Sequence, residues 1–354
     1  MRPIGVAIVG TGWCGGIRAE TCAASALVES LHLAEIRPER LAEVARSTGA
    51  RTATSDYREL LKIDLVEAVY ISATPETTHY PMARDFLATG KHVFLEKPIA
   101  LELDEADELG TLARRNNLKF SIGYSQRFNP KFAYVRKAIR AGTIGRPVSA
   151  LVSRHITRSL GKKISGRVKL SPAAMESTHD LDFVLWCLEP AKPVRVYSQV
   201  NYGVMQETTG APIADTQWIT VTMDTGMSFV VGGGWTLPPG YPNFSTTWIE
   251  MIGTEGAIMV DDSHRDVVLN TMQKGMVLPM STMPGEPVDH TYAGPMAAET
   301  LYFLEAVVYD RPVMVTPEHA RMVMEVYIAA DLSAERNEPV TLPLAAATPV
   351  RAVA

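Results

Sequence analysis

The stretch IGVAIVGTGWCG, residues 4–15, sets a glycine-rich turn directly after an apolar run. The run predicts a strand and the residues after the turn predict a helix, and G-x-G-x-x-G in that context is typical of dinucleotide-binding units. Its glycines permit a tight turn and close approach of the backbone to a pyrophosphate, while the helix N-terminus favours the phosphate charge. We therefore expect this turn to bind a dinucleotide through Gly10, Thr11, Gly12, Trp13 and Cys14.

An acidic residue follows at the spacing that such a unit requires. Glu35 lies at the end of a second predicted strand, about 20 residues past the glycines. A carboxylate there accepts hydrogen bonds from the ribose 2′-hydroxyl and repels a 2′-phosphate, so it favours NAD. Arg37 is the opposing signal, because a guanidinium could pair with that phosphate, and it leaves NADP open. A solvated loop charge is the alternative for Arg37.

Short apolar runs alternate with helical patterns over the first third of the chain. This alternation predicts βαβ units around a parallel sheet. Right-handed crossovers then make residues 1–122 a doubly wound Rossmann domain that binds the dinucleotide. The predicted strands are residues 4–9, 27–34, 68–72, 92–95 and 119–122.

The pattern changes after Gly123. Residues 194–268 are strand-like and rich in Thr, Val and Trp, whereas residues 269–295 have little periodicity and predict a loop. We expect residues 123–354 to form a second, α+β domain with a large, open, mostly antiparallel sheet flanked by helices. The predicted helices are 130–141, one that begins near residue 172, and 317–334, before a short strand at 340–342.

The composition excludes several classes of protein. With 354 residues, 46% hydrophobic and 21% charged, the chain is typical of a two-domain globular protein. A net charge of -5 argues against nucleic acid as a partner, and the lack of a long apolar stretch argues against a membrane span. Three cysteines without a CxxC pair predict neither disulfides nor a metal site. We expect a cytoplasmic protein with a small-molecule partner.

Lys97 is the first candidate for acid–base chemistry. Pro98 disfavours the helical region for Lys97, so the amine is held extended at the end of a predicted strand. Ligands of doubly wound folds bind at that edge of the sheet, and removal of hydride from an alcohol needs a base, which a lysine can supply. Glu96 precedes it in extended chain and therefore points to the opposite face. A surface lysine whose stem covers apolar atoms is the alternative.

A predicted helix after residue 170 carries the second candidate. Ser171 has the character of its N-cap and Pro172 that of its first residue. Glu176, His179 and Asp182 are three positions apart, so they are neighbours on a helix surface. A histidine flanked by carboxylates can be oriented towards a substrate hydroxyl, although a structural histidine is the alternative.

With further motifs, these pieces closely resemble the Gfo/Idh/MocA family of NAD(P)-dependent sugar and cyclitol oxidoreductases over nearly the whole chain. The resemblance implies that Lys97 is the catalytic acid/base and that His179 lies at the reacting hydroxyl. It also implies that the open sheet packs subunits into a homodimer or homotetramer. The further motifs are Ala73-Thr74-Pro75 with His79, residues 90–98 and 123–130, Gly253-Thr254-Glu255-Gly256 and Val315-Thr316-Pro317-Glu318.

The resemblance also implies contacts to both ligands. Trp235, after three glycines, could stack on a sugar face, with a core or interface tryptophan as the alternative. Tyr124, Arg127 and Asn129 are expected at the junction of the two domains. The expected cofactor contacts beyond the glycine turn and residues 35 and 37 are Thr74, Pro75, His79, Glu96, Lys97 and Arg127. The expected substrate contacts are Lys97, Tyr124, Arg154, Met175, His179 and Trp235.

One position departs from the family pattern. Many members place an aspartate four residues before the histidine, where this chain has Met175. A thioether cannot accept a proton or fix a histidine tautomer as a carboxylate does. Glu176 is still within helical reach of His179, and we expect it to act as the substitute catalytic carboxylate.

A basic segment runs from Arg154 to Lys169 without an acidic residue. It predicts either a loop that closes over an anionic substrate, such as a sugar acid or a phosphorylated or nucleotide-linked sugar, or a solvated or subunit-contacting loop. Its further basic residues are Arg158, Lys162, Lys163 and Arg167.

The predicted function is hydride transfer between a nicotinamide cofactor, NAD with NADP open, and a secondary alcohol or ketone carbon. The expected partner is a polyol, sugar, sugar acid or cyclitol. Reduction of a C=N bond or a non-sugar carbonyl is an alternative, which the Met175 departure favours. A non-catalytic NAD-binding sensor or assembly protein is an alternative of another class, against which Lys97 and His179 argue, because a sensor needs neither.

Overall fold

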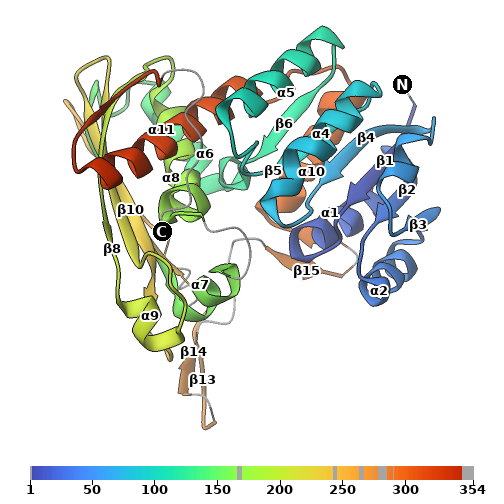
Figure 1. The fold of residues 1–354 in the computed structure, drawn as a ribbon, viewed down its shortest axis with the longest axis horizontal. Coiled ribbons are helices and arrows are strands. Elements are labelled where there is room, and N and C mark those ends of the chain that lie inside the picture. The colour runs from blue at the N-terminus through green and yellow to red at the C-terminus, as the bar shows by residue number, and fades with distance from the viewer. Residues whose placement is uncertain are drawn as a thin grey trace. The chain divides into compact units, whose positions relative to one another are not determined.

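The chain forms two compact units (Figure 1). The computed structural model describes residues 2–165, 170–241, 245–262, 267–273, 275–277, 285–289 and 291–344. Unit 1 consists of Met1–Phe128 with Thr282–Arg321, and unit 2 of Asn129–Ser281 with Met322–Ala354. These units differ from a simple division at residue 122 because a late segment of the chain packs with the first unit.

Unit 1 is built on a six-stranded sheet in the order β3-β2-β1-β4-β5-β6, with every neighbouring pair parallel. This order confirms the predicted doubly wound Rossmann sheet. Its order reverses between β1 and β4, which places a ligand crevice at the carboxyl ends of these strands. The strands are β1 (Ile4–Val9), β2 (Val28–Ala34), β3 (Thr52–Thr54), β4 (Val66–Ile71), β5 (His92–Glu96) and β6 (Phe120–Gly123).

Alternate residues of these strands bury one face of the sheet against helices. Val6, Ile8 and Leu33 are fully buried and pack in one cluster with Ala19 of α1 and Phe303. The period of two follows from the strand pleat, which sends successive side chains to opposite faces. The helices of unit 1 are α1 (Trp13–Ala23), α2 (Pro38–Thr48), α3 (Arg58–Leu61), α4 (His79–Ala88), α5 (Leu103–Arg115) and α10 (Pro295–Val308), with 3₁₀ turns η1 (Glu76–Thr78) and η2 (Ser125–Phe128).

The late segment of unit 1 brings α10 against α1. Tyr70, Phe94 and Phe303 form a ring cluster with centroid separations of 5.3–5.6 Å, so α10 completes the core of the nucleotide-binding unit. The prediction of a loop over residues 269–295 is wrong. The described residues there form two short antiparallel ribbons, β13 (Leu269–Thr271) with β14 (Gly275–Val277) and β15 (Glu286–Val288) with β16 (Thr291–Ala293). Strands of three residues are too short to show a periodicity.

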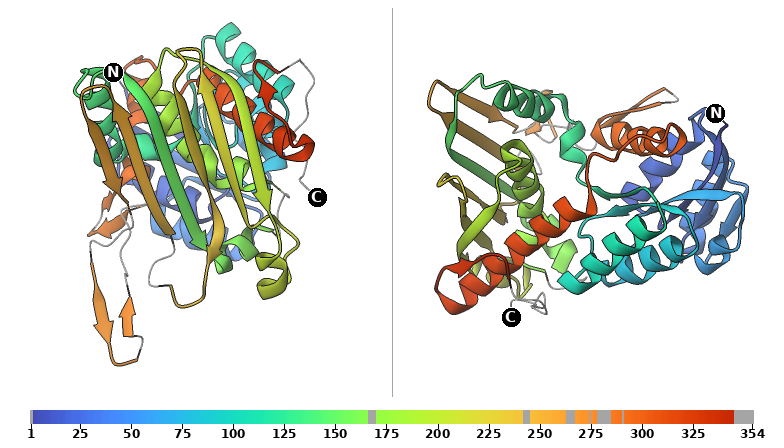
Figure 2. Two further views of the ribbon diagram at one scale, coloured as in Figure 1. Left: turned by 90° about the vertical axis from the view of Figure 1, so that its left-hand side faces the viewer. Right: turned by 90° about the horizontal axis from the view of Figure 1, so that it is seen from above.

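Unit 2 is built on a seven-stranded sheet in the order β12-β11-β7-β10-β9-β8-β17. All neighbours are antiparallel except β7 and β10, which run parallel, and this confirms the mostly antiparallel sheet. Figure 2 (left) shows its strands facing the viewer. The strands are β7 (Pro147–Thr157), β8 (Pro193–Asn201), β9 (Thr216–Met223), β10 (Ser228–Leu237), β11 (Ser245–Gly253), β12 (Ala257–Asp261) and β17 (Val340–Thr341).

The helix expected near residue 172 begins as a π-helical turn, η3 (Ala173–Ser177), and continues as α8 (Thr178–Leu188). Glu176 therefore lies on the π turn and His179 on the α-helix, so the spacing between them is not that of a regular α-helix. The remaining helices are α6 (Pro130–Arg140), α7 (Arg158–Ser165), α9 (Val204–Thr209) and α11 (Pro317–Arg336), of which α11 begins in unit 1 and ends in unit 2.

A buried polar network holds the start of the π turn. The Gln217 side chain accepts a hydrogen bond from the Ala173 amide (3.0 Å), and the Ser171 hydroxyl accepts one from the Ala174 amide (3.1 Å). Both side chains also donate to the Asp331 carboxylate at 3.0 Å. Burial raises the pKa of Asp331 to about 7, although these two donors oppose the rise.

This carboxyl group should make the stability of the protein depend on pH. The pKa of Asp331 is higher in the folded chain than its ordinary value of 3.8. Its contribution to the free energy of unfolding is therefore fully present below about pH 4, declines as the pH rises to about 7, and does not change further at higher pH. The full shift in the pKa of Asp331 corresponds to a change of roughly 4 kcal/mol in the free energy of unfolding. Urea unfolding from pH 4 to 8 should therefore show a smaller decline for Asp331→Asn than for the parent chain. The exposed variant Glu338→Gln should keep the parent decline, and an equal decline in Asp331→Asn would contradict the assignment.

Candidate functional site

The glycine turn of unit 1 has the geometry of a pyrophosphate cradle. A Cβ on Gly15 would lie 1.8 Å from the Gly10 carbonyl oxygen, and one on Gly10, at φ +81°, would lie 2.7 Å from the Cα of Ala73. These two positions therefore exclude any side chain. A Cβ on Gly12 would meet only an Arg37 nitrogen, at 3.8 Å, so the space beside Gly12 is open to a ligand.

Helix α1 presents its N-terminus to the same space. Its N-cap is Gly12, which has no side chain to cap the first N–H groups of the helix. Such N–H groups and the helix dipole favour an anion, so a pyrophosphate fits the turn. Trp13 is 67% exposed beside it, Cys14 is partly exposed, and the Thr11 side chain is buried. The glycine turn and the start of α1 thus lie where the sequence predicted them.

Glu35 is fixed at the end of β2 by the turn itself. Its carboxylate accepts hydrogen bonds from the Thr11 amide (2.8 Å) and the Thr11 hydroxyl (3.2 Å). Burial favours the protonated form, but hydrogen bonds from Arg37 and Thr11 outweigh it and lower the pKa of Glu35 to about 2. The group is a carboxylate at neutral pH, as an acceptor for ribose hydroxyls must be.

Arg37 is not free to meet a 2′-phosphate. Its guanidinium donates to both oxygens of Glu35, at 2.9 and 3.1 Å, while the side chain remains 60% exposed. The two opposing signals of the sequence are thus one ion pair. A carboxylate at this position would repel a 2′-phosphate. Its ion pair with Arg37 also engages the guanidinium that would otherwise bind that phosphate.

Lys97 is half-buried directly after β5, at the carboxyl end of the sheet. Its neighbour Glu96 accepts two hydrogen bonds from the buried Arg18 of α1, at 2.7 and 2.9 Å. The carboxylate predicted to contact the cofactor is therefore engaged by α1. This ion pair joins the strand end that carries Lys97 to the helix that begins at the cradle.

The His79 ring also supports the lysine turn. One ring nitrogen lies 2.7 Å from the carbonyl oxygen of Pro98 and the other 3.1 Å from that of Ala73. The histidine is 1% exposed, so it joins two turns and does not present a nitrogen to solvent. Thr74 and Pro75, on the turn that it supports, are exposed.

Two further predicted contacts of unit 1 are buried. Tyr124 is 1% exposed and Arg127 is 2% exposed. The Arg127 guanidinium donates to the carbonyl oxygen of Met314 at 3.1 Å. In unit 2, the Asn129 side chain caps α6 by accepting from the amide of Lys131.

The candidate residues of unit 2 lie around the start of α8. His179 is half-buried, and Asp180 beside it is fully buried. Arg154 of β7 donates to both oxygens of Asp180, at 2.7 and 2.8 Å. Burial opposes the Arg154 charge, but Asp180 outweighs it and raises the pKa of Arg154 above its usual range. Arg154 therefore fixes the helix that carries His179, and its charge is already compensated.

The position of the missing aspartate holds a buried thioether side chain. Met175 is 4% exposed on the π turn, whereas Glu176 is half-buried. Glu176 also contributes to the raised pKa of Arg154, so its charge lies within electrostatic reach of the Arg154–Asp180 pair. Unit 2 thus has a carboxylate near His179 at residue 176 and none at residue 175.

Two interpretations of the substrate contacts require revision. Trp235 is 1% exposed, its indole N–H donates to the carbonyl oxygen of Ala214, and Gly161 packs against its ring, so it is a core residue. The basic segment is not a loop over residues 154–165, because these residues form the end of β7 and all of α7. Arg167 and Lys169 lie outside the described residues.

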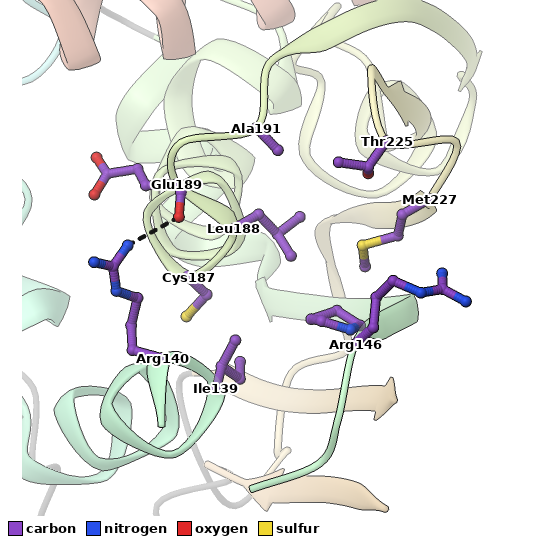
Figure 3. A pocket seen from close by; sticks show the side chains of 10 residues that line it. Ile139, Arg140, Arg146, Cys187, Leu188, Glu189, Ala191, Thr225 and Met227 are labelled. Atoms are coloured by element: carbon purple, nitrogen blue, oxygen red, sulfur yellow. Dashed lines mark hydrogen bonds between the residues drawn. The ribbon is translucent and has the colours of Figure 1, made fainter. Parts of the chain in front are cut away.

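The cavity shown in Figure 3 lies elsewhere in unit 2. It has a volume of about 310 Å³ and is lined by Ile139, Cys187, Met227 and neighbouring residues, none of which is a candidate site residue. Within the described ranges, no group of three or more acidic, histidine or cysteine side chains is placed to hold a metal ion. Among those same residues, no helix is long and apolar enough to cross a membrane.

Sequence reasoning missed the buried charges that support the site. Arg18 is 0% exposed and Glu299 is 1% exposed, yet nothing in their spacing links residues so far apart. A signal existed for Arg18, which lies between the buried apolar residues Ile17 and Ala19 of α1. The signal for Asp180 was weaker. It is a third carboxylate close to His179 in the sequence, besides Glu176 and Asp182.

Comparison with known proteins gives a consistent result. A family profile described as an oxidoreductase family with an NAD-binding Rossmann fold matches residues 4–124, and a GFO/IDH/MocA C-terminal domain profile matches residues 132–259. A scyllo-inositol 2-dehydrogenase (NAD(+)) of Bacillus subtilis is 27% identical, with 86% of this chain and 85% of that protein covered. A UDP-N-acetylglucosamine 3-dehydrogenase of Acidithiobacillus ferrooxidans is 26% identical, with 93% and 96% covered.

Solved structures share the fold. A scyllo-inositol dehydrogenase from Lactobacillus casei with bound NAD(H) and scyllo-inositol has a TM-score of 0.82 at 20% identity, with 96% of this chain and 99% of that chain covered. GenD2 from gentamicin A biosynthesis, in complex with NAD, has a TM-score of 0.83 at 23% identity, with 97% of each chain covered. At these coverages, the similarity in fold includes both units of the chain.

Removal of Glu35 should change the choice of cofactor. Glu35→Ala frees the Arg37 guanidinium for a 2′-phosphate, so calorimetric titration should show the ratio of NADP to NAD affinity rising by about tenfold or more. The matched variant Glu35→Ala with Arg37→Ala should lose most of that gain. An unchanged ratio in the single variant would show that this ion pair does not select the cofactor.

Breaking the buried pair of unit 2 should destabilise the protein. Asp180→Asn leaves the Arg154 charge without its buried carboxylate, and such a loss costs about 3–5 kcal/mol. Urea unfolding measures this loss in the free energy of unfolding. The exposed pair of Arg84 and Glu108 is the control, because Glu108→Gln should change the free energy of unfolding by about 1 kcal/mol or less. Equal effects of the two variants would refute the structural role of Asp180.

Proposed function

Because the chain belongs to the Gfo/Idh/MocA family of NAD-binding oxidoreductases, we propose that it transfers hydride between NAD and a secondary alcohol or ketone carbon of a sugar or cyclitol. The observation that carries the proposal is the position of Lys97. The Arg18–Glu96 pair joins its strand end to the helix of the NAD cradle. Relatives named for inositols and for a UDP-linked amino sugar support this class of substrate.

The proposed chemistry divides between two side chains. Bound NAD supplies the hydride acceptor. Lys97 removes the hydroxyl proton through Nζ as the hydride leaves the carbinol carbon, and it returns that proton in the reverse direction. His179 orients the hydroxyl by a hydrogen bond. Glu176 supplies the carboxylate that Met175 does not.

The buried pair of Arg154 and Asp180 weakens the case for an anionic substrate. A guanidinium that already donates to both oxygens of a buried carboxylate has little to offer a second anion. Lys162 and Lys163 are exposed on α7, which supports the alternative of a solvated basic face. We therefore favour neutral cyclitols and sugars over sugar acids and phosphorylated sugars.

The buried thioether of Met175, at the position where many family members have an aspartate, favours one second candidate, reduction of a C=N bond or of a non-sugar carbonyl on the same scaffold. Incubation with NAD⁺ or NADH and a panel of cyclitols, sugars, sugar acids, nucleotide sugars, imines and ketones, followed at the NADH absorbance, distinguishes the two. Binding of NAD without turnover on every compound would support the non-catalytic sensor instead.

We further propose that a second copy of the chain covers the open face of the unit 2 sheet. Leu151, Trp248, Ile252 and Met259 are 37–62% exposed, and the strand register places all four on the same face of β7, β11 and β12. An apolar patch of this kind is typical of a subunit interface, so the proposed assembly is a homodimer or homotetramer. The free thiols of Cys14, Cys22 and Cys187 support a reducing compartment such as the cytoplasm.

Replacement of the lysine should separate binding from turnover. In Lys97→Met, turnover should fall by about 10²-fold or more, because a thioether cannot take the hydroxyl proton, while the affinity for NAD changes by about threefold or less. Stopped-flow absorbance and calorimetry measure the two quantities. The exposed variant Lys62→Met is the control, and turnover within about tenfold of the parent in Lys97→Met would refute the role.

Glu176 is tested by a change that keeps its shape. Glu176→Gln should lower turnover by about tenfold or more, with little change in the affinity for NAD, if this carboxylate replaces the missing aspartate. Met175→Asp should then restore part of the turnover in the Glu176→Gln background. Parent turnover in Glu176→Gln would contradict the substitution.

A further inference from the structure

Glu299 is a buried carboxylate of unit 1 with no role in the chemistry described above. It lies on α10, is 1% exposed, and accepts a hydrogen bond of 2.8 Å from Nη2 of Arg18. A residue of α10 is thereby tied to the helix of the NAD cradle, although the two are separated by 281 positions in the chain.

Arg18 joins two carboxylates at once. The same guanidinium donates to Glu96 at 2.7 and 2.9 Å, and its Nη1 donates to the Thr300 hydroxyl at 2.9 Å. The Arg18 side chain is fully buried and lies over the Phe94 ring at 4.1 Å, so water does not screen these charges. One cation therefore serves two anions in a medium of low polarity.

The charges of this cluster reach the cradle. Burial raises the pKa of the Cys14 thiol to about 12, and Glu96 and Glu299 add to that rise while Arg18 and Lys97 oppose it. Cys14 is part of the glycine turn and lies in the first turn of α1. Both carboxylates thus act electrostatically on an atom of the cofactor cradle.

The order of the sheet indicates which half of the cofactor feels these charges. Glu35 directly follows β2, so the adenosine half belongs to the β1–β2 side and the nicotinamide half to the β4–β5–β6 side of the crevice. Glu96 ends β5 on that second side. The oxidised nicotinamide ring is a cation and the reduced ring is neutral, so a buried negative charge stabilises only the oxidised form.

We propose that Glu299, together with Glu96 on the shared Arg18, makes the cradle discriminate between the redox states of its cofactor in favour of NAD⁺ over NADH. The proposal rests on NAD binding and not on the substrate proposed above. It assigns a direction to the site, because a cradle that favours NAD⁺ is loaded for the removal of hydride from an alcohol.

The test is the ratio of the two dissociation constants in the absence of any substrate. Calorimetric titration of Glu299→Gln with NAD⁺ and with NADH should show that ratio shifted towards NADH by about fivefold, because the loss of one negative charge removes an attraction for the cationic ring and none for the neutral ring. The amide keeps the size of the side chain and can still accept a hydrogen bond from Arg18.

Two control variants separate charge from structure. Glu305→Gln removes an exposed carboxylate of the same helix, paired with Arg311, and should leave the ratio unchanged. Glu299→Asp keeps the charge but shortens the side chain, so it should keep the parent ratio even if both affinities fall.

The remaining outcomes overturn the proposal. An equal loss of affinity for NAD⁺ and NADH in Glu299→Gln would show that Glu299 only fastens α10 to α1. If both affinities and their ratio stay at the parent values, the charge of Glu299 does not act on the cofactor. Should Glu299→Gln fail to fold, Glu96→Gln must give the same shift towards NADH, and an unshifted ratio there refutes the idea. Because no substrate is present, failure of the proposed dehydrogenase activity would leave this test intact.

Discussion

The burial of Arg18 is the constraint on which unit 1 depends. A guanidinium without access to water must be paired, because an isolated buried charge is highly unfavourable. The partners come from β5 and α10, so one side chain ties the helix of the cradle to the strand end that precedes Lys97 and to a segment nearly 300 residues along the chain. The geometry of the NAD cradle and the position of Lys97 therefore share one anchor.

Unit 2 uses the same device at its own candidate site. Arg154 of the sheet is paired with Asp180 next to His179, and the uncharged side chains of Ser171 and Gln217 hold the π turn that leads into α8. In both units the buried arginine fixes the element that carries a candidate catalytic residue, and its own charge is paired with a carboxylate. Buried ion pairs of this kind are weak sources of stability but strong geometric restraints, because removal of either partner leaves a charge in an apolar medium.

The sequence predicted the parts of the site that depend on local chain geometry. The G-x-G-x-x-G turn, Glu35 at the end of β2 and Lys97 after β5 all lie where the strand pattern put them. Its errors concern elements whose conformation depends on distant contacts. The three-residue strands β13 to β16 carry too few residues for a period, and the basic segment forms a strand end and a helix because α7 packs on Trp235 of β10.

By itself, the sequence determined the Rossmann architecture, the glycine turn, the acid expected to select the cofactor and the candidate lysine and histidine, because each depends on spacing along one strand or one helix. The tertiary structure decided which charges are available. Arg37, Arg154 and Glu96 could all be assigned to ligands from their position in the chain, yet each is engaged by another side chain. Arg154 and Glu96 pair with residues far from them in sequence, and Arg37 pairs with a near neighbour through its side-chain conformation. Spacing along the chain does not state either kind of pairing, so only the folded chain could show it.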